Sequence, residues 1–159
     1  MRGETELNCR FKLATRLNTL TETKSLDEVN IEETPLEDNL DANLFGFFMS
    51  ERMRAIIDAH LSGREGLQWV KAYIDGPNGM SWTYYVPLFW KQLDILNWEK
   101  TDFPDNLVFD SDKIKDLAIF NEPTDANCLT TGVYVTHKLK TALLKAGMTG
   151  LDFFKMPVE

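Results

Sequence analysis

A run of carboxylates between residues 94 and 116 holds the side chains best suited to acid–base chemistry. General acid–base catalysis needs two carboxyl groups held at a defined separation in a cleft, one of them with a raised pKa. The spacing along this span does not define such a pair, and solvation of loops explains the same composition. The residues are Asp94, Glu99, Asp102, Asp105, Asp110, Asp112 and Asp116.

The other side chains with chemical potential are two histidines and two cysteines, His60, His137, Cys9 and Cys128. None of the four has the close spacing typical of zinc ligands, and the cysteines form no CxxC pair, so a reduced pair is expected. No GxSxG, SxxK or HExxH motif occurs, and no glycine-rich phosphate-binding loop follows a strand-like run. The sequence therefore predicts no metal, no cofactor and no enzymatic activity.

Aromatic side chains crowd into the seventeen residues from Trp82 to Trp98. Within an alternating strand, Trp82 and Tyr84 would share one face. Large aromatic residues usually belong to a core, but Trp and Tyr also carry much of the binding energy at protein interfaces. Trp82, Tyr84 and Trp98 are therefore candidates for partner binding as well as for the core.

Residues 26–43 show the strongest shift of composition in the chain, because they contain seven acidic residues and no basic one. A solvated loop or a mobile arm explains such a segment. The alternative is an acidic lip that meets a basic partner, with sparse apolar residues that let it lie on the domain. The candidate partner-binding acids are Asp27, Glu28, Glu32, Glu33, Glu37, Asp38 and Asp41.

A strand–helix–strand pattern that would position these side chains occurs twice, at about 45–74 and 132–158. In each copy an apolar run precedes Ser50 or Thr136, whose hydroxyl can cap a helix. Apolar residues then follow at helical spacing, and Gly147 offers a left-handed helix end. Two copies are too few for a solenoid. The chain is therefore expected to be α+β, with a mixed or antiparallel sheet built around a duplicated unit.

The rest of the chain predicts shorter elements. Residues 6–13 alternate as a strand, and the turn cluster at 75–79 predicts a β-hairpin whose second strand ends at Pro87. A short helix is expected over 88–97. A short strand at 107–109 and a helical turn at 111–117 follow.

We expect one domain over residues 1–159. Residues 1–44 would contribute the N-terminal strand and the acidic segment, and residues 45–158 the duplicated core.

The net charge of −8 and the pI near 4.8 disfavour nucleic-acid binding, which needs a basic surface. No apolar run is long enough for a membrane span. The N-terminal MRGETELNCRF has no apolar signal core. These features predict a cytoplasmic protein that binds neither membranes nor nucleic acid.

Five segments in order are FFMSERMRAII, LQWVKAYI, YYVPLFWKQLDIL, NLVFDSDKIKDLAIF and YVTHKLKTALLKAGMTGLDFFKMPV. Together they resemble a family of bacterial immunity proteins, which are small cytoplasmic proteins encoded beside polymorphic toxins, including contact-dependent and type VI secretion effectors. The resemblance covers Phe45 to Val158 and is best at the helix entry from Met49 to Met53, at Tyr84-Tyr85 and in the final helix and aromatic strand. The second copy departs from it, with Thr136-His137 where Ser-Glu is usual. The resemblance implies neutralisation of a toxin by binding and carries over no catalytic residue.

The leading hypothesis is therefore a stoichiometric inhibitor, a monomer or homodimer whose acidic segment 27–41, with Trp82, Tyr84 or Trp98, occludes the basic active-site cleft of a cognate toxin. One alternative is a small-ligand-binding or hydrolytic domain with a carboxylate-lined pocket between the two units. Another is an adaptor or chaperone for a secreted effector. Convergent carboxylates with raised pKa values would favour the pocket, and a flat acidic face would favour the inhibitor.

Overall fold

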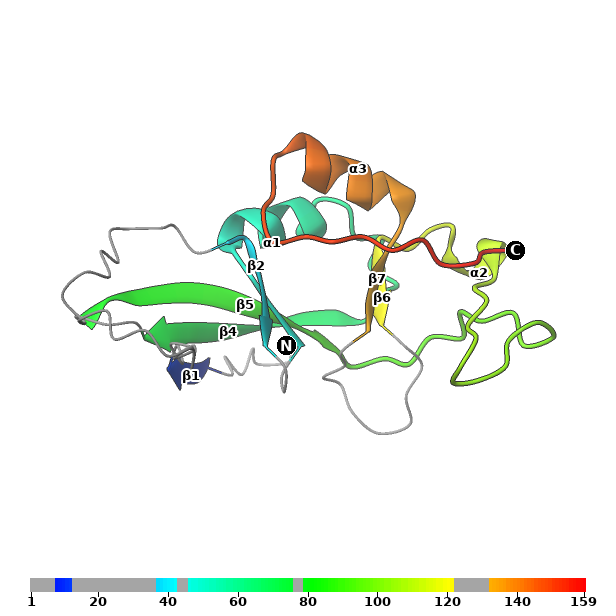
Figure 1. Ribbon diagram of the computed structural model, residues 1–159, viewed down its shortest axis with the longest axis horizontal. Coiled ribbons are helices and arrows are strands. Elements are labelled where there is room, and N and C mark those ends of the chain that lie inside the picture. Colours follow the sequence, from blue (N-terminus) through cyan, green and yellow to red (C-terminus); the bar gives the residue numbers. More distant parts are fainter. Residues whose placement is uncertain (1–7, 13–36, 43–45, 76–78, 122–131) are drawn as a thin grey trace, which may run out of the picture.

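The computed structural model describes residues 8–12, 37–42, 46–75, 79–121 and 132–159, with backbone alone for residues 8–12, 41 and 42 (Figure 1). The strands are β1 (Asn8–Lys12), β2 (Asn39–Ala42), β3 (Gly46–Met49), β4 (Leu67–Asp75), β5 (Ser81–Phe89), β6 (Ile119–Asn121) and β7 (Val133–Val135). The helices are α1 (Glu51–Asp58), α2 (Ser111–Ile114) and α3 (His137–Lys145). The α+β class predicted from the sequence is confirmed.

The larger sheet has five strands in the order β1-β4-β5-β3-β2. It is mixed, because β1 runs parallel to β4 whereas the other pairs are antiparallel. β6 and β7 form a separate antiparallel pair. Figure 1 shows α1 and α3 on the same side of the large sheet, with β6, β7 and α2 toward the C-terminal end of the molecule.

The predicted hairpin is formed by β4 and β5, which pair from Leu67 opposite Phe89 to Asp75 opposite Ser81. The expectation that Pro87 ends the second strand is wrong, since β5 continues to Phe89. Pro87 lies opposite Trp69 of β4, beyond the single pairing of β5 with β3 at Tyr85. Its missing amide therefore removes at most one hydrogen bond of the sheet.

Each of the two longer helices follows a strand directly, as the repeated pattern predicts. Ser50 caps α1, because its hydroxyl accepts a hydrogen bond from the Met53 amide at 3.1 Å. Thr136 has the same extended backbone before α3 but makes no side-chain capping bond. Its hydroxyl instead lies 3.4 Å from the Ala118 carbonyl oxygen. After α3 the chain turns at Gly147 with a φ of 67°, the left-handed end that the sequence predicts.

The second copy does not close with a strand, so the strand expected after α3 is wrong. Residues 151–157 belong to no strand, and only Val158 forms a β-bridge, with Phe109. In the first copy, β4 lies between β1 and β5 and pairs with both. The C-terminal segment instead meets irregular chain. Among the described residues, its backbone bonds join only Phe109 and Ser111 to Pro157 and Glu159.

Residues 88–97 form no helix, contrary to the prediction. The chain leaves β5 and runs irregularly to Leu96, which bridges to Phe109. The strand expected at 107–109 does not form either, since only Phe109 of these residues makes isolated bridges, to Leu96 and to Val158. The apolar residues of both segments pack into a local core instead. In it, Ile95, Leu96, Leu107 and Phe109 are buried together with Leu117 and Phe120. The helical turn expected at 111–117 is present as α2.

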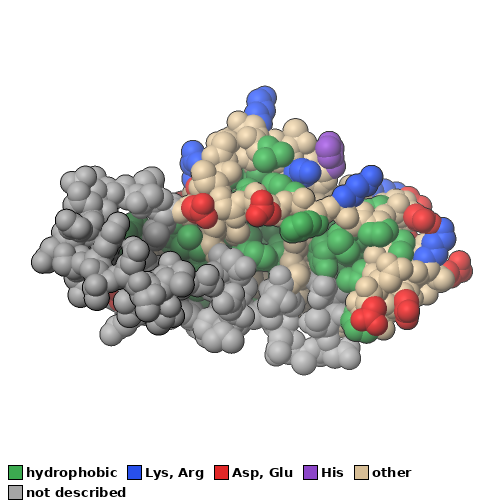
Figure 2. Space-filling view, viewed as in Figure 1, with side chains coloured by type: hydrophobic (Ala, Val, Ile, Leu, Met, Phe, Trp, Pro, Cys, Tyr) green, Lys and Arg blue, Asp and Glu red, His purple; other side chains and the backbone are tan. Residues whose placement is uncertain are grey.

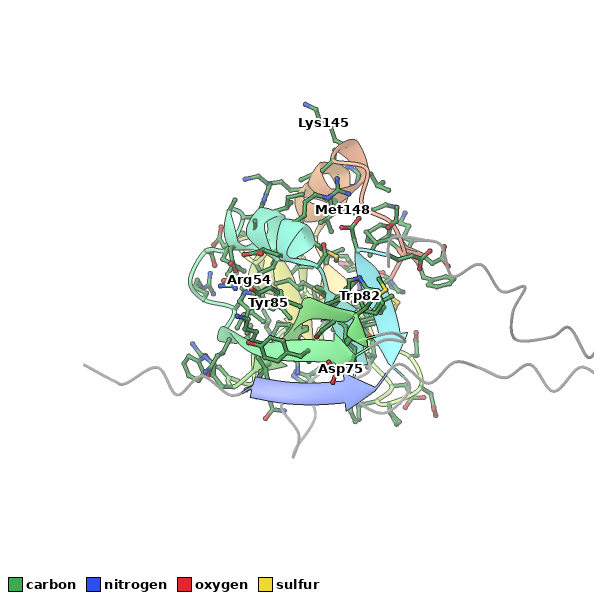
Figure 3. All side chains as sticks on the ribbon, turned by 90° about the vertical axis from the view of Figure 1, so that its left-hand side faces the viewer. Arg54, Asp75, Trp82, Tyr85, Lys145 and Met148 are labelled. Carbon is green, nitrogen blue, oxygen red and sulfur yellow. The ribbon has the colours of Figure 1, made fainter. Side chains whose placement is uncertain are left out.

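The main core lies between the two helices and the sheet. Met53 and Ile57 of α1 and Leu139 and Leu143 of α3 are fully or almost fully buried in it. Met49, Phe89, Ala118, Ile119 and Met148 complete this cluster. Figure 3 shows α1 between the sheet and α3, with Met148 beside the two helices and Arg54 of α1 beside Tyr85 of the sheet. Among the described residues, no helix is long and apolar enough to cross a membrane.

Candidate partner-binding surface

The acidic segment predicted as a binding lip divides into two parts. Asp27, Glu28, Glu32 and Glu33 lie outside the described residues, as does the side chain of Asp41. Glu37 is exposed, whereas Asp38 is buried. The prediction that Asp38 contacts a partner is therefore wrong, because its carboxylate is enclosed by the protein itself.

Asp38 joins three parts of the chain. Its carboxylate accepts hydrogen bonds from the Ser50 hydroxyl at 2.7 Å, from Arg52 Nη2 at 2.9 Å and from the Thr149 amide at 3.0 Å. Its own amide donates to the Thr149 hydroxyl at 3.0 Å. Burial raises the pKa of Asp38, but the bonds from Arg52, Ser50 and Thr149 outweigh this effect and lower the pKa to about 2. Asp38 is thus a charged structural link between β2, α1 and the end of α3.

The aromatic candidates on β5 belong to the core. Trp82 and Tyr84 share one face of the sheet, as predicted, and pack with Phe48, Val70 and Ala72. Tyr84 is 4% exposed, and its hydroxyl donates to the Glu37 carbonyl oxygen at 2.7 Å. Burial, together with the nearby Asp38 and Glu37 carboxylates, raises the pKa of Tyr84 to about 12. Tyr84 is therefore not a partner-binding residue, and Trp82 is only partly exposed.

Trp98 is the aromatic candidate that the structure leaves on the surface. It is 57% exposed, and the ring of Phe103, 48% exposed, lies 6.4 Å away at an angle of 50°. The Trp98 indole nitrogen donates to Asp94 at 3.0 Å. The pKa of Asp94 is lowered, first by its bond from Lys113 and then by that from Trp98. The indole is thus held with its apolar surface open to a partner.

Three further carboxylates, Glu99, Asp102 and Asp105, are exposed around this aromatic pair in sequence. Within the residues that the structure describes, none of the three forms an ion pair. We call Trp98, Phe103, Glu99, Asp102 and Asp105 the aromatic–acidic surface. In Figure 2, Asp and Glu side chains gather with an exposed hydrophobic side chain at the right-hand end, below α2.

The backbone beneath this surface is tightly bonded. The Thr101 hydroxyl exchanges hydrogen bonds with the Val108 amide and carbonyl groups, both at 3.1 Å. Asn97 donates to the Val108 carbonyl at 2.8 Å, and Asp102 and Asn106 exchange two backbone bonds. Lys113 ties Asp94 to the Leu96 carbonyl, with both bonds at 2.9 Å. These bonds hold the aromatic pair in place before any partner arrives, which lowers the entropy cost of binding.

Only Trp98 of this surface is predicted from the sequence as a partner-binding residue; Glu99, Asp102 and Asp105 are noted there as acid–base candidates, and Phe103 is not named. The aromatic run ends at Trp98, and Phe103 stands alone in a loop-like stretch. The sequence signal that could have pointed to Phe103 is the proline after it. A residue before proline favours an extended or turn conformation, so Phe103 is not expected on the buried face of a helix.

A groove does lie between the two units, but its lining is not the carboxylate-rich one that the sequence predicts. A groove of about 1640 Å³ lies where both units meet, and Asp116 and Asp152 are the two carboxylates among its described lining residues. Asp116 is ion-paired with Arg64 at 3.1 Å. The described part of the lining therefore offers no converging carboxylates, and the pKa is lowered for each of the carboxyl groups Asp38, Glu65 and Asp94.

Glu65 is the most deeply buried carboxylate of the described residues, at 1% exposure. It accepts hydrogen bonds from the Ser62 amide and from the Ala118 amide, both at 3.0 Å. Burial raises its pKa, but the backbone amides lower it by more. Glu65 therefore links the loop after α1 to the residue before β6. Its carboxylate is occupied by these structural hydrogen bonds.

The histidines and cysteines form no shared site in the described part of the chain. His60 Nδ1 lies 2.7 Å from the Ile56 carbonyl oxygen, and His137 is exposed at the start of α3. Cys128 and the Cys9 side chain lie outside the described residues. No group of three potential metal ligands occurs among the residues described.

No family model matches this chain, and neither the curated proteins nor the solved structures give a significant match. The resemblance to immunity proteins therefore stays a prediction from the sequence.

Proposed function

We propose that this protein is an immunity protein that binds a cognate bacterial toxin in the cytoplasm and neutralises it by stoichiometric occlusion of its active site. It catalyses no reaction in this proposal. The observation that carries it is the aromatic–acidic surface, where two large exposed rings are held on a bonded backbone among carboxylates that form no ion pair with any described residue.

Such a surface fits a basic cleft. Trp is enriched among the residues that dominate interface energy, and its apolar ring releases water when it is covered. Carboxylates around it would steer a basic toxin into contact and disfavour acidic partners. Many toxins that act on nucleic acid have basic clefts, because they bind phosphates. An acidic protein that covers such a cleft would exclude the substrate.

The two alternatives make different predictions. The carboxylate-lined pocket is disfavoured, because the groove between the units is lined mainly by apolar and basic residues. An adaptor or chaperone would use a similar surface but would leave its client active. Measuring the activity of the bound partner therefore distinguishes an adaptor, whose client stays active, from an inhibitor.

The first experiment identifies the partner and its response. The tagged protein is purified from its host, and a partner recovered at equal stoichiometry is assayed for toxin activity while this protein is added. Activity that falls to zero at one equivalent is the expected result. A bound partner that stays fully active would reject the inhibitor reading in favour of an adaptor.

Replacing both aromatic residues tests the surface itself. Trp98→Ala with Phe103→Ala should weaken toxin binding by about 30-fold or more, because a truncated hot spot costs about 2 kcal/mol or more. Trp90→Ala is the matched control, since Trp90 is 62% exposed but lies outside the aromatic–acidic surface. Equal affinities for both variants, measured by calorimetry on folded protein, would show that the aromatic pair is not the contact.

Charge reversal distinguishes this surface from the acidic segment. Changing Glu99, Asp102 and Asp105 to Lys should lower the association rate constant by about tenfold at low salt and flatten its salt dependence. The comparison variant reverses Asp27, Glu28, Glu32 and Glu33 and leaves Asp38 intact, because Asp38 is structural. A loss confined to the comparison variant would place the contact on the acidic segment instead.

A further inference from the structure

The groove between the two units is a second surface, of different size and charge. It lies where α1, β7, α3 and residues 150–158 meet, and it encloses about 1640 Å³. Small-molecule pockets usually measure about 300–1,000 Å³. The groove is thus larger than a typical small ligand requires and matches a segment of polypeptide better.

The rim of the groove is basic although the chain as a whole is acidic. Among the lining residues that the structure describes, five are Lys or Arg and two are Asp. Arg64 is paired with Asp116, but Lys138 and Lys155 are exposed and have no ion-pair partner in the part of the chain that the structure describes. Lys140 lies over the Phe153 ring at 5.3 Å, which leaves its charge at the groove. These cations are available to an anionic ligand.

The lining between these cations is apolar. Val135, Leu151, Phe153 and Met156 line the groove and are only partly buried, and Phe154 beside them is 87% exposed. Figure 2 shows hydrophobic side chains along the middle of this face, with Lys or Arg side chains above them toward α3. The ligand that suits this lining carries both apolar and acidic side chains.

We propose that this groove binds an acidic, apolar peptide segment of a partner protein. The partner's aliphatic side chains would cover Val135, Leu151 and Phe153, and its carboxylates would pair with Lys138 and Lys155. A nucleic acid fits less well, because its phosphates need a continuous basic surface and the lining here is largely aliphatic. The proposal concerns a separate surface and does not depend on toxin binding by the aromatic–acidic surface.

The test uses the full chain and a labelled peptide that alternates Leu and Glu, with fluorescence anisotropy as the readout. The expected result is saturable binding of this peptide that depends on Lys138 and Lys155, whereas any binding of a Leu–Lys peptide of equal length, for example at the aromatic–acidic surface, should not depend on them. The double variant Lys138→Glu with Lys155→Glu should bind about tenfold more weakly, because two rim charges change sign. Lys138→Glu leaves α3 intact, since an acidic residue suits the first turn of a helix.

Lys145→Glu is the matched control on the same helix. Lys145 is exposed at the end of α3, does not line the groove and points away from the body of the molecule (Figure 3). Its variant should bind the Leu–Glu peptide as the parent does. Equal weakening by Lys145→Glu would show that general charge, and not the groove, attracts the peptide, and would overturn the proposal.

Two other occupants give distinct outcomes. Binding of labelled single-stranded oligothymidylate that is lost in the double variant, without binding of the Leu–Glu peptide, would identify a nucleic-acid surface. Binding of the Leu–Glu peptide only after Asp27, Glu28, Glu32 and Glu33 are changed to Asn or Gln, and not to the parent protein, would identify the chain's own acidic segment as the occupant. Either result overturns the proposal of a partner peptide, as does the absence of any peptide binding.

Discussion

At the scale of single residues, Asp38 links folding to pH. Its pKa falls from 3.8 to about 2 on folding, because Arg52, Ser50 and Thr149 bond the charged form. A lowered pKa means that the stabilisation is present above pH 4 and is lost as the pH falls toward 2. A shift of this size corresponds to about 2 kcal/mol. The parent protein should therefore lose about 2 kcal/mol more stability across this range than Asp38→Asn does.

Urea unfolding of both proteins between pH 7 and pH 2.5 measures this difference. At pH 7, Asp38→Asn should be the less stable protein by about 2 kcal/mol. Glu99→Gln is the control, because Glu99 is exposed and ion-paired with no residue that the structure describes. Parallel pH profiles for the parent and Asp38→Asn would contradict the role given to this carboxylate.

Asp38 also shows why single sites are hard to predict. In the sequence it is one acid in a run of acids, which predicts solvent exposure. Its donors stand at positions 50, 52 and 149, and only the fold brings them together. Trp98 is exposed for the opposite reason, since no apolar periodicity after it provides a strand or helix that could cover it, and its role in partner binding stays a prediction.

At the scale of elements, the connection after α3 depends on one glycine. Gly150 has a φ of 73°, and a Cβ added there would overlap the Asn39 carbonyl oxygen. Gly147 has a similar φ of 67° but open space around the same position. Gly147→Ala should cost about 1 kcal/mol from backbone strain alone. Gly150→Ala should cost at least about 2 kcal/mol more, because β2 must shift away from the end of α3.

Comparing Gly147→Ala with Gly150→Ala distinguishes the cost of backbone strain from the cost of steric overlap with Asn39. Thermal unfolding of both, compared with the parent protein, gives the two losses directly. Equal losses would mean that Asn39 and its hydrogen bonds to Thr149 and Gly150 do not hold β2 against the end of α3.

The elements were predicted where a local pattern sufficed. The residue types at Ser50 and Gly147 locate the start of α1 and the end of α3, and the turn at 75–79 locates the β4–β5 hairpin. The strand expected after α3 has the same apolar composition as β4. It does not form because a strand needs neighbours along its length, and residues 151–157 pair with no strand that the structure describes. Partners of this kind depend on topology and are not encoded in a local pattern.

At the scale of the whole molecule, charge of opposite sign is carried by different segments of the chain. The aromatic–acidic surface comes from the loop between β5 and β6, whereas the basic groove is built mainly from β7, α3 and the C-terminal segment. A net charge of −8 hides this separation. The molecule therefore has two candidate contact surfaces that would select partners of opposite charge.

The two strand–helix units share one core, and this predicts how the molecule unfolds. Leu143 of α3 is fully buried against Met53 and Ile57 of α1, so neither helix has a complete core alone. Leu143→Ala should cost about 2–5 kcal/mol. Leu144→Ala, one position along and 53% exposed, should cost less than about 0.5 kcal/mol.

The shared core further predicts that Leu143→Ala destabilises the whole domain and not α3 alone. Far-UV circular dichroism, which is dominated by secondary structure, and tryptophan fluorescence should give the same urea midpoint for Leu143→Ala, lowered equally from that of the parent protein. Two separate midpoints would mean that the sheet with α1 can stay folded after α3 has detached. Coincident midpoints would mean that α1, α3 and the sheet fold together, so that the groove between the two units exists only in the intact domain.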